Sequence, residues 1–276
     1  FIDYTKFVNT ENPNPEDFII KSGKKRIALL DEVRGFLLLT MLLYHSYYLL
    51  STYFGISFGE TLLRLSAPAV PLVAATFILI SGICVRLSRD VPKRGLLLLA
   101  FALLFSVVTI GVLPRFRIVG MGTWFGILHL IACSKLLFAA GGGLFDKIPP
   151  FLGALASLFL FIFTSGVQGG SFGFFDALQL SLPEWLYRNN WLFFLGFHNG
   201  DFYSWDYFPL LPYFFLFLFG AFLGIYAQKK QFPAWVEKPH MLFFGWLGRH
   251  ALTLYVLHLP VLYGLFFLVT EIFKKT

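Results

Sequence analysis

The stretch LDEVRGFLLLTMLLYHSYYLL, residues 30–50, has the length and apolar content of a helix that spans a membrane, yet it contains Asp31, Arg34 and His45. A spanning helix needs about 20 mostly apolar residues, because each adds about 1.5 Å toward a hydrocarbon core of about 30 Å. Charged groups inside such a helix are costly and usually face a protein interior or a watery cavity. The stretch therefore predicts a membrane protein with a polar site inside it.

The whole chain has the same character. Of its 276 residues, 57% are hydrophobic and only 13% are charged, and the mean hydropathy is +0.72. These values exclude an ordinary soluble domain and predict an all-α, polytopic helix bundle, with one transmembrane domain over residues 24–276 after a polar segment at 1–23. About seven transmembrane helices are expected, at 30–52, 66–87, 95–113, 124–140, 151–166, 209–227 and 247–269.

Lysine and arginine residues predict the orientation of these helices. They cluster before the first span, between the second and third spans, and between the sixth and seventh: Lys24, Lys25, Arg26, Arg86, Arg89, Lys93, Arg94, Lys229, Lys230 and Lys238. Because cytoplasmic loops are enriched in positive charge, these connections and the N-terminus are expected in the cytoplasm, and the loop 167–208 outside. The net charge of +7 is then a topology signal, and we expect no nucleic-acid partner.

The polar groups of the first span fall on one face. Arg34 and His45 are 11 residues apart, which is about three helical turns plus 20° and about 16 Å of rise. Asp31 lies three residues before Arg34 and can pair with its guanidinium group. One interpretation is a functional face. The other is that Asp31 and Arg34 anchor the helix at the interface and His45 is a hydrogen-bonded core residue.

Other spans add similar groups. His129 and His258 are expected in the middle and outer half of the bilayer, near the depth of His45, where they either line a polar cavity or join helices by hydrogen bonds. Arg86, Lys135 and Arg249 join Arg34 in the cytoplasmic half, where these cations suit an anionic ligand such as a nucleotide pyrophosphate, or, for Arg86 above all, anchor their helices at the cytoplasmic side. Cys84 and Cys133 lie inside apolar runs and are interpreted as small buried hydrophobes, so no metal site is expected.

Five segments carry a resemblance to a known family. In order, RIALLDEVRGFLLLTMLLYH (26–45), FILISGI (77–83), FGILHLIA (125–132), DYFPLLPYFFLFLFGAFLG (206–224) and LGRHALTLYVLHLP (247–260) resemble bacterial proteins with the heparan-alpha-glucosaminide N-acetyltransferase catalytic domain. This family lies within the transmembrane acyltransferases. The resemblance extends from about residue 24 to 265 and implies an integral protein of a bacterial cytoplasmic membrane.

The resemblance also implies a reaction and its participants. An acyl group, expected to be acetyl, would pass from cytoplasmic acetyl-CoA or another acyl-CoA to a hydroxyl or amine of a sugar-like acceptor reached from the outer side. The expected partners are the lipid bilayer, acyl-CoA and a carbohydrate or glycolipid acceptor. Whether the protein also forms a homo-oligomer is left open by the resemblance. The roles implied are catalysis by His45 and Asp206, acyl-CoA binding by Arg34, Arg249 and Lys135, and support of the cavity by Asp31, His129 and His258.

Two roles keep alternatives. His45 is expected to act as a general base, or as a nucleophile that carries the acyl group. Asp206 would orient a histidine or the acceptor, or else cap the sixth span. Two other classes of function also use such polar groups: a proton-coupled transporter or flippase, and a noncatalytic membrane subunit.

Overall fold

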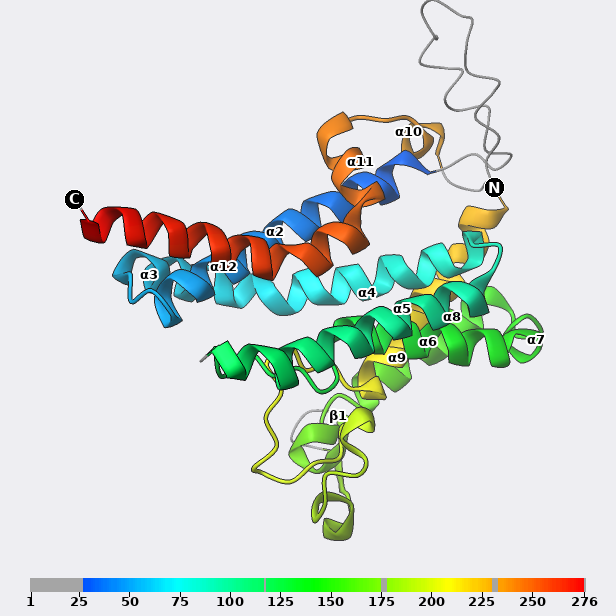
Figure 1. Cartoon of the computed structure of the whole chain (residues 1–276). Helices are drawn as coiled ribbons and strands as arrows, with labels where there is room; N and C mark the ends of the chain where they lie inside the picture. Colours follow the sequence, from blue (N-terminus) through cyan, green and yellow to red (C-terminus); the bar gives the residue numbers. More distant parts are fainter. Residues whose placement is uncertain (1–26, 117, 175–177, 230–232, 276) are drawn as a thin grey trace, which may run out of the picture.

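The computed structural model describes residues 27–116, 118–174, 178–229 and 233–275. The segment 1–23, the basic residues at 24–26 and Lys230 lie outside these ranges. The described chain is a bundle of long helices with one short hairpin, so the predicted all-α, polytopic class is confirmed (Figure 1).

The helices follow one another with short connections. The longer elements are α2 (Ala28–Thr52), α3 (Ser57–Ser66), α4 (Val70–Leu87), α5 (Val91–Ser106), α6 (Ile127–Ala140), α8 (Pro150–Phe163), α9 (Leu210–Gln228), α11 (Leu242–Arg249) and α12 (Ala251–Lys275). The shorter ones are η2 (Ala67–Ala69), η3 (Val107–Val112), η4 (Leu113–Phe116), α7 (Gly142–Phe145), η5 (Val167–Gly169), η6 (Glu184–Tyr187), η7 (Phe193–Leu195) and α10 (Ala234–Glu237). Strands β1 (Ser171–Phe174) and β2 (Leu178–Ser181) form an antiparallel hairpin.

Six described helical stretches are long and apolar enough to cross a membrane: Ala28–Thr52, Ser57–Leu87, Val91–Phe116, Pro150–Gly169, Leu210–Gln228 and Ala251–Val269. The span expected at 124–140 is the shorter helix α6. Its 14 residues rise only about 21 Å, less than the hydrocarbon thickness of about 30 Å. Helix α6 is therefore an inner helix of the bundle that reaches only part of the way across.

Two boundaries differ from the sequence prediction. The second span was expected to begin at residue 66 but begins at Ser57. The prediction missed α3 because Glu60 and Arg64 lower its hydropathy, although these two side chains form an ion pair at 2.6 Å. The last span begins only at Ala251, since the chain breaks at His250 between α11 and α12.

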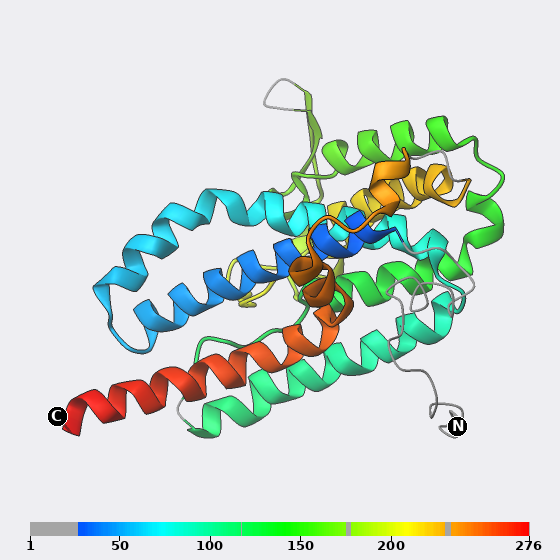
Figure 2. The same ribbon diagram turned by 90° about the horizontal axis from the view of Figure 1, so that it is seen from above.

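The basic connections lie at one end of the bundle. Figure 1 shows α7 and α10 at the end opposite α3 and the C-terminus, and Figure 2 shows α12 running alongside α2. Contacts agree, because the Glu32 carboxylate at the start of α2 accepts hydrogen bonds from the backbone N–H of His240 and Met241, and Gln228 Nε2 donates to the carbonyl of Arg86. The positive-inside rule requires the connections rich in lysine and arginine to lie at the same end of the bundle, as they do here. That this end faces the cytoplasm stays a prediction.

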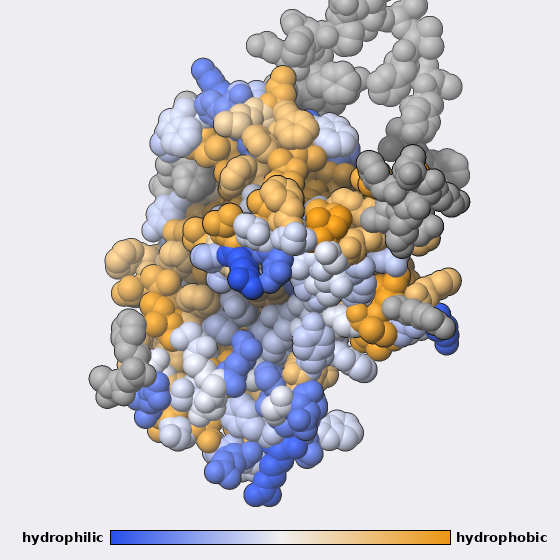
Figure 3. Space-filling view, turned by 90° about the vertical axis from the view of Figure 1, so that its left-hand side faces the viewer, coloured by the Kyte–Doolittle hydropathy of each residue, from blue (hydrophilic) through white to orange (hydrophobic). Residues whose placement is uncertain are grey.

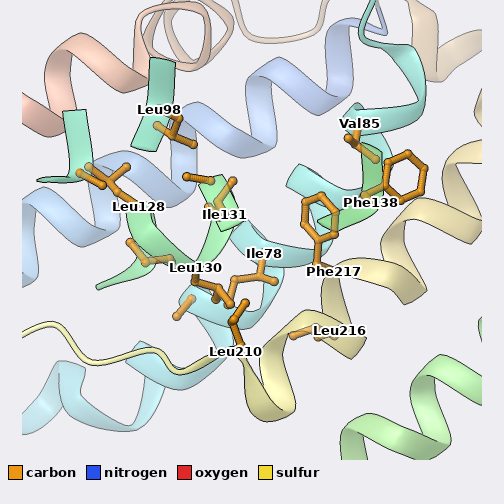
Figure 4. Close-up of a cluster of buried hydrophobic side chains, with 14 of the residues drawn as sticks. Ile78, Val85, Leu98, Leu128, Leu130, Ile131, Phe138, Leu210, Leu216 and Phe217 are labelled. Atoms are coloured by element: carbon orange, nitrogen blue, oxygen red, sulfur yellow. The ribbon is translucent and has the colours of Figure 1, made fainter. Parts of the chain in front are cut away.

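Glycines allow the closest helix contacts. A Cβ at Gly82 of α4 would overlap the backbone carbonyl of Phe217 in α9, and a Cβ at Gly220 would overlap that of Leu79. Such small residues let membrane helices approach closely enough for dense packing. Beside this contact, buried side chains of α4, α5, α6 and α9 form the main core (Figure 4).

The loop expected outside lies at the lower part of the molecule in Figure 1, around β1. It contains two 3₁₀ turns, η6 and η7, and the side chains of Trp185 and Trp191 are largely exposed. Figure 3, which views the end where the C-terminus lies, shows hydrophilic residues gathered in its lower part and hydrophobic residues over much of its upper part.

Candidate active site

The first cavity has a volume of about 790 Å³ and lies at the basic end of the bundle, between α2, α4, α5, α6 and α12. We call it the basic cavity, because its lining includes five cationic side chains and one carboxylate: Arg34, Arg89, Arg94, Lys135, Arg249 and Asp31. All three residues assigned to acyl-CoA from the sequence line it. Arg89 and Arg94 were interpreted only as topology signals, although their place between two spans put them beside the same region.

Arg34 is held in place from two sides. Its Nη1 donates to Asp31 Oδ1 at 3.2 Å, the pair expected from the spacing, and its Nη2 donates to Cys84 Sγ of α4 at 2.9 Å. The α2 backbone is fixed here by α11, since a Cβ at Gly35 would overlap the carbonyl of Phe244. Glu32, 6% exposed, ties the start of α11 to the same turn. The guanidinium group is therefore presented to the basic cavity by a rigid support.

The second cavity, of about 420 Å³, lies between α2, α4 and the segment 203–208. We call it the aromatic cavity. One wall is polar and aromatic: Tyr44, His45, Tyr48, Tyr203, Trp205, Asp206 and Tyr207. The other wall is aliphatic: Leu37, Leu38, Met41, Val70, Val73 and Ala74.

Two side chains line both cavities. Phe77 of α4 and Tyr255 of α12 belong to the lining of the basic and the aromatic cavity alike. The two cavities are therefore neighbours that meet at these residues. Arg34 and His45 lie on the same side of α2, as expected, but on different sides of this boundary.

His45 is buried and contacts a second histidine. Its Nδ1 lies 2.8 Å from Nε2 of His258, with ring centroids 4.9 Å apart and planes at 18°, as suits a hydrogen bond in a nearly common plane. The Nδ1 of His258 bonds the backbone carbonyl of Tyr255. A carbonyl only accepts, so His258 Nδ1 carries a proton, and in the neutral ring its Nε2 is the acceptor.

This arrangement fixes the tautomer of His45. Because His258 Nε2 accepts, His45 Nδ1 donates, and the lone pair of the neutral ring lies on His45 Nε2. Trp205 packs against the His45 ring with centroids 4.6 Å apart. The pair therefore holds one basic nitrogen in a defined position at the aromatic cavity.

Asp206 lies in the polar wall, and within the described part of the chain its carboxylate bonds no histidine. Its Oδ2 accepts from the backbone N–H of Ile127 at 3.1 Å and from the Tyr255 hydroxyl at 3.0 Å. Burial raises the pKa of Asp206 above its ordinary value of 3.8, against the smaller lowering by these two donors. Asp206 thus joins the start of α6 to α12 and fixes Tyr255 at the boundary between the cavities.

His129 lines neither cavity, and nor does His258; of the two interpretations left open for His129, its contacts fit hydrogen bonding between helices. Its Nδ1 accepts from the backbone N–H of Gly126, and its Nε2 lies 3.3 Å from the hydroxyl of Ser106. These contacts are those of a residue that caps α6 and joins it to α5.

Sequence reasoning missed Tyr255 and Trp205. Each had a signal, since Tyr255 lies three residues before His258 on one helix face and Trp205 directly precedes Asp206. Among the described residues, no group of three or more His, Cys, Asp or Glu side chains is placed to hold a metal ion.

Comparison with known proteins gives one match. The model of a family described as "Heparan-alpha-glucosaminide N-acetyltransferase, catalytic" matches residues 26–260, which include every candidate residue named above. No curated protein matches the chain, and no solved structure does.

Proposed function

The chain belongs to the heparan-alpha-glucosaminide N-acetyltransferase catalytic-domain family and is a membrane acetyltransferase, and from this premise we propose that it transfers the acetyl group of acetyl-CoA to an amine or hydroxyl of a sugar-like acceptor. The observation that carries the proposal is the pair of cavities that meet at Phe77 and Tyr255, one cationic and one containing His45. The donor would occupy the first and the acceptor the second.

The basic cavity suits the donor by its charge. Coenzyme A carries phosphate groups at one end and a thioester at the end of a long, narrow arm. Arg34, Lys135 and Arg249 would bind phosphate oxygens, with Arg89 and Arg94 adding charge at the same cavity. The arm would then extend toward Phe77 and Tyr255. This end of the protein would face the cytoplasm, as the lysine and arginine bias predicts.

The aromatic cavity suits a sugar-like acceptor. Its tyrosine and tryptophan rings offer flat apolar faces together with hydroxyl and N–H groups, which match a molecule with both kinds of surface. An acceptor amine or hydroxyl placed at His45 Nε2 would lie on the acceptor side of the boundary, within reach of a thioester carbonyl presented from the other side.

The reaction balances with His45 as general base. His45 Nε2 takes a proton from the acceptor nitrogen or oxygen as that atom attacks the thioester carbonyl carbon. The tetrahedral intermediate breaks its C–S bond, and the proton passes from His45 to the leaving thiolate of CoA. While His45 is protonated, His258 Nε2 accepts a hydrogen bond from the charged ring. In the variant route His45 Nε2 itself attacks the carbonyl carbon and the C–S bond breaks to release the CoA thiolate; the acceptor then takes the acetyl group from His45, and its proton ends on the CoA thiol.

The test uses the purified protein in lipid nanodiscs with acetyl-CoA and glucosamine. We expect His45→Ala to lower the rate of CoA release by about 10²–10⁴-fold, the usual cost of losing a general base, with little change in the dissociation constant of acetyl-CoA. His250→Ala, which changes an exposed histidine outside both cavities, is the matched control. Wild-type turnover in His45→Ala would contradict the proposed role.

The same preparation separates the transporter alternative. In proteoliposomes loaded with unlabelled acceptor, a transporter would exchange radiolabelled acceptor across the membrane without acetyl-CoA. An acetyltransferase would label the acceptor only when acetyl-CoA is present on the side of the basic cavity.

A further inference from the structure

The aromatic cavity has a feature that a small water-soluble sugar does not explain, namely its aliphatic wall. Leu37, Met41, Val70 and Val73 contribute apolar surface beside the polar side chains His45 and Asp206 in the lining of the same cavity. A ligand that is polar throughout would leave this surface without a partner. A ligand with a polar head and an apolar chain would cover both walls.

The rim of the aromatic cavity lies at the lipid-facing surface of two spanning helices. On α2, Thr40 and Tyr44 line the cavity, and Leu43 beside them is 45% exposed. On α4, Val73 lines the cavity, and Leu72 beside it is 70% exposed. Exposed apolar side chains of spanning helices face lipid, so the rim of the cavity is adjacent to the bilayer on both helices.

The rim residues are themselves partly exposed. Thr40, Tyr44 and Val73 are each neither buried nor fully exposed while they line the cavity. Next to them, η2 supplies the small residue Ala69, which is exposed and also lines the cavity. Side chains that touch both a cavity and the surface mark its opening, which here lies between α2 and the start of α4.

We infer that the acceptor is an amphipathic lipid with a sugar-like head, which enters sideways from the bilayer between α2 and α4 and leaves its chain along the aliphatic wall. The inference rests on the proposed function for the identity of the reaction, and it selects the lipid-linked acceptor from the two acceptor classes that the resemblance implied. The sugar-like head of this lipid lies among Tyr44, His45 and Trp205, whereas its apolar tail passes Val73 and Thr40 toward the bilayer.

The apolar tail of the acceptor contributes by keeping the acceptor in the membrane. Lipid tails are about as apolar as the aliphatic wall, so moving the chain from bilayer to cavity changes its hydrophobic free energy little. The chain confines the acceptor to the membrane, which raises its concentration at a sideways opening. A blocked opening should therefore stop a lipid acceptor more strongly than a soluble sugar that enters past Tyr203, which is 59% exposed at the polar wall.

The test uses a dodecyl glucosaminide whose chain carries a photoreactive diazirine, added to the protein in nanodiscs. After illumination, labelled peptides are mapped by mass spectrometry. We expect labelling at residues 37–44 and 69–77, and its loss in Val73→Trp and in Thr40→Trp, which fill the opening from opposite helices. Leu72→Trp and Leu43→Trp, which add the same ring on the neighbouring lipid-facing residues, should keep it.

Acetyl-CoA binding, measured on every variant, reports whether the neighbouring basic cavity is still folded. Labelling spread over all lipid-facing helices, or unchanged in both opening variants, overturns the inference. If methyl glucosaminide is then still acetylated, the proposed function stands with a soluble acceptor. Cavity labelling lost in the two opening variants supports the lipid site even if no acceptor is acetylated, an outcome that would count against the proposed reaction alone.

Discussion

Replacing His258 tests the tautomer argument most directly. His258→Leu removes the acceptor that lies 2.8 Å from His45 Nδ1. The buried His45 N–H then has no partner, either tautomer of the ring becomes accessible, and the protonated ring of the transition state loses a charge-assisted hydrogen bond. Such a bond contributes about 1.5–3 kcal/mol, which corresponds to a fall in kcat of about 10- to 160-fold.

His258→Gln supplies the comparison. The glutamine amide oxygen can still accept from His45 Nδ1, so this variant should retain much more activity than His258→Leu. The assay is kcat for acetyl transfer at saturating acetyl-CoA, with the dissociation constant of acetyl-CoA as a check on folding. A ¹⁵N NMR spectrum of labelled histidines reads the tautomer of His45, which a purely structural role of His258 would not change. The reasoning is refuted if His258→Leu keeps kcat within about twofold of wild type, or if the glutamine variant is equally impaired.

Three further predictions concern the supports of the site. Arg34→Ala should weaken acetyl-CoA binding by about 10- to 160-fold in calorimetric titration, the value of a lost charge-assisted bond, whereas Arg64→Ala on exposed α3 should not. Glu32→Ala leaves two backbone N–H groups without their acceptor, at roughly 1–3 kcal/mol each, and should lower the unfolding temperature in detergent; an unchanged temperature, as expected for Glu60→Ala, would contradict this. For Asp206, the folded-state pKa lies above the ordinary 3.8, so its contribution to stability is present below pH 3.8 and lost as the pH rises through the folded-state pKa. Wild-type stability should therefore fall across that window relative to Asp206→Asn, and parallel pH profiles of the two proteins would contradict the assignment.

Hydropathy and length were enough to predict most of the fold. The first span was expected at 30–52 and is Ala28–Thr52, because nothing in that stretch interrupts the apolar run for long. The start of the second span was predicted too late. A hydropathy scale scores Glu60 and Arg64 as two separate charges, although in the structure they form an ion pair. The short α6 was placed correctly but expected as a crossing, because its apolar content does not reveal that it lies inside the bundle.

The site was predictable only along single helices. The spacing of Arg34 and His45 predicted that they lie on one face of the first helix at different depths. In the structure each lines a cavity on that face, Arg34 the basic cavity and His45 the aromatic cavity. That they line different cavities depends on Phe77 and Tyr255, which come from other helices. The contact between His45 and His258 joins residues 213 positions apart and requires α12 to pack on α2 in one register. No local pattern carries that information, and for the same reason His129 could not be told from a cavity residue.

The boundary at Phe77 and Tyr255 has an electrical consequence for the proposed reaction. The acetyl group, which leaves the donor formally as an acylium ion, would cross the boundary in one direction, and the acceptor proton that ends on the CoA thiol would cross it in the other. Each turnover then exchanges one positive charge for another, and no net charge moves across the membrane. The net free energy of the transfer would then contain no contribution from the membrane voltage, so the acetylation equilibrium would be the same in an energised and in a de-energised membrane.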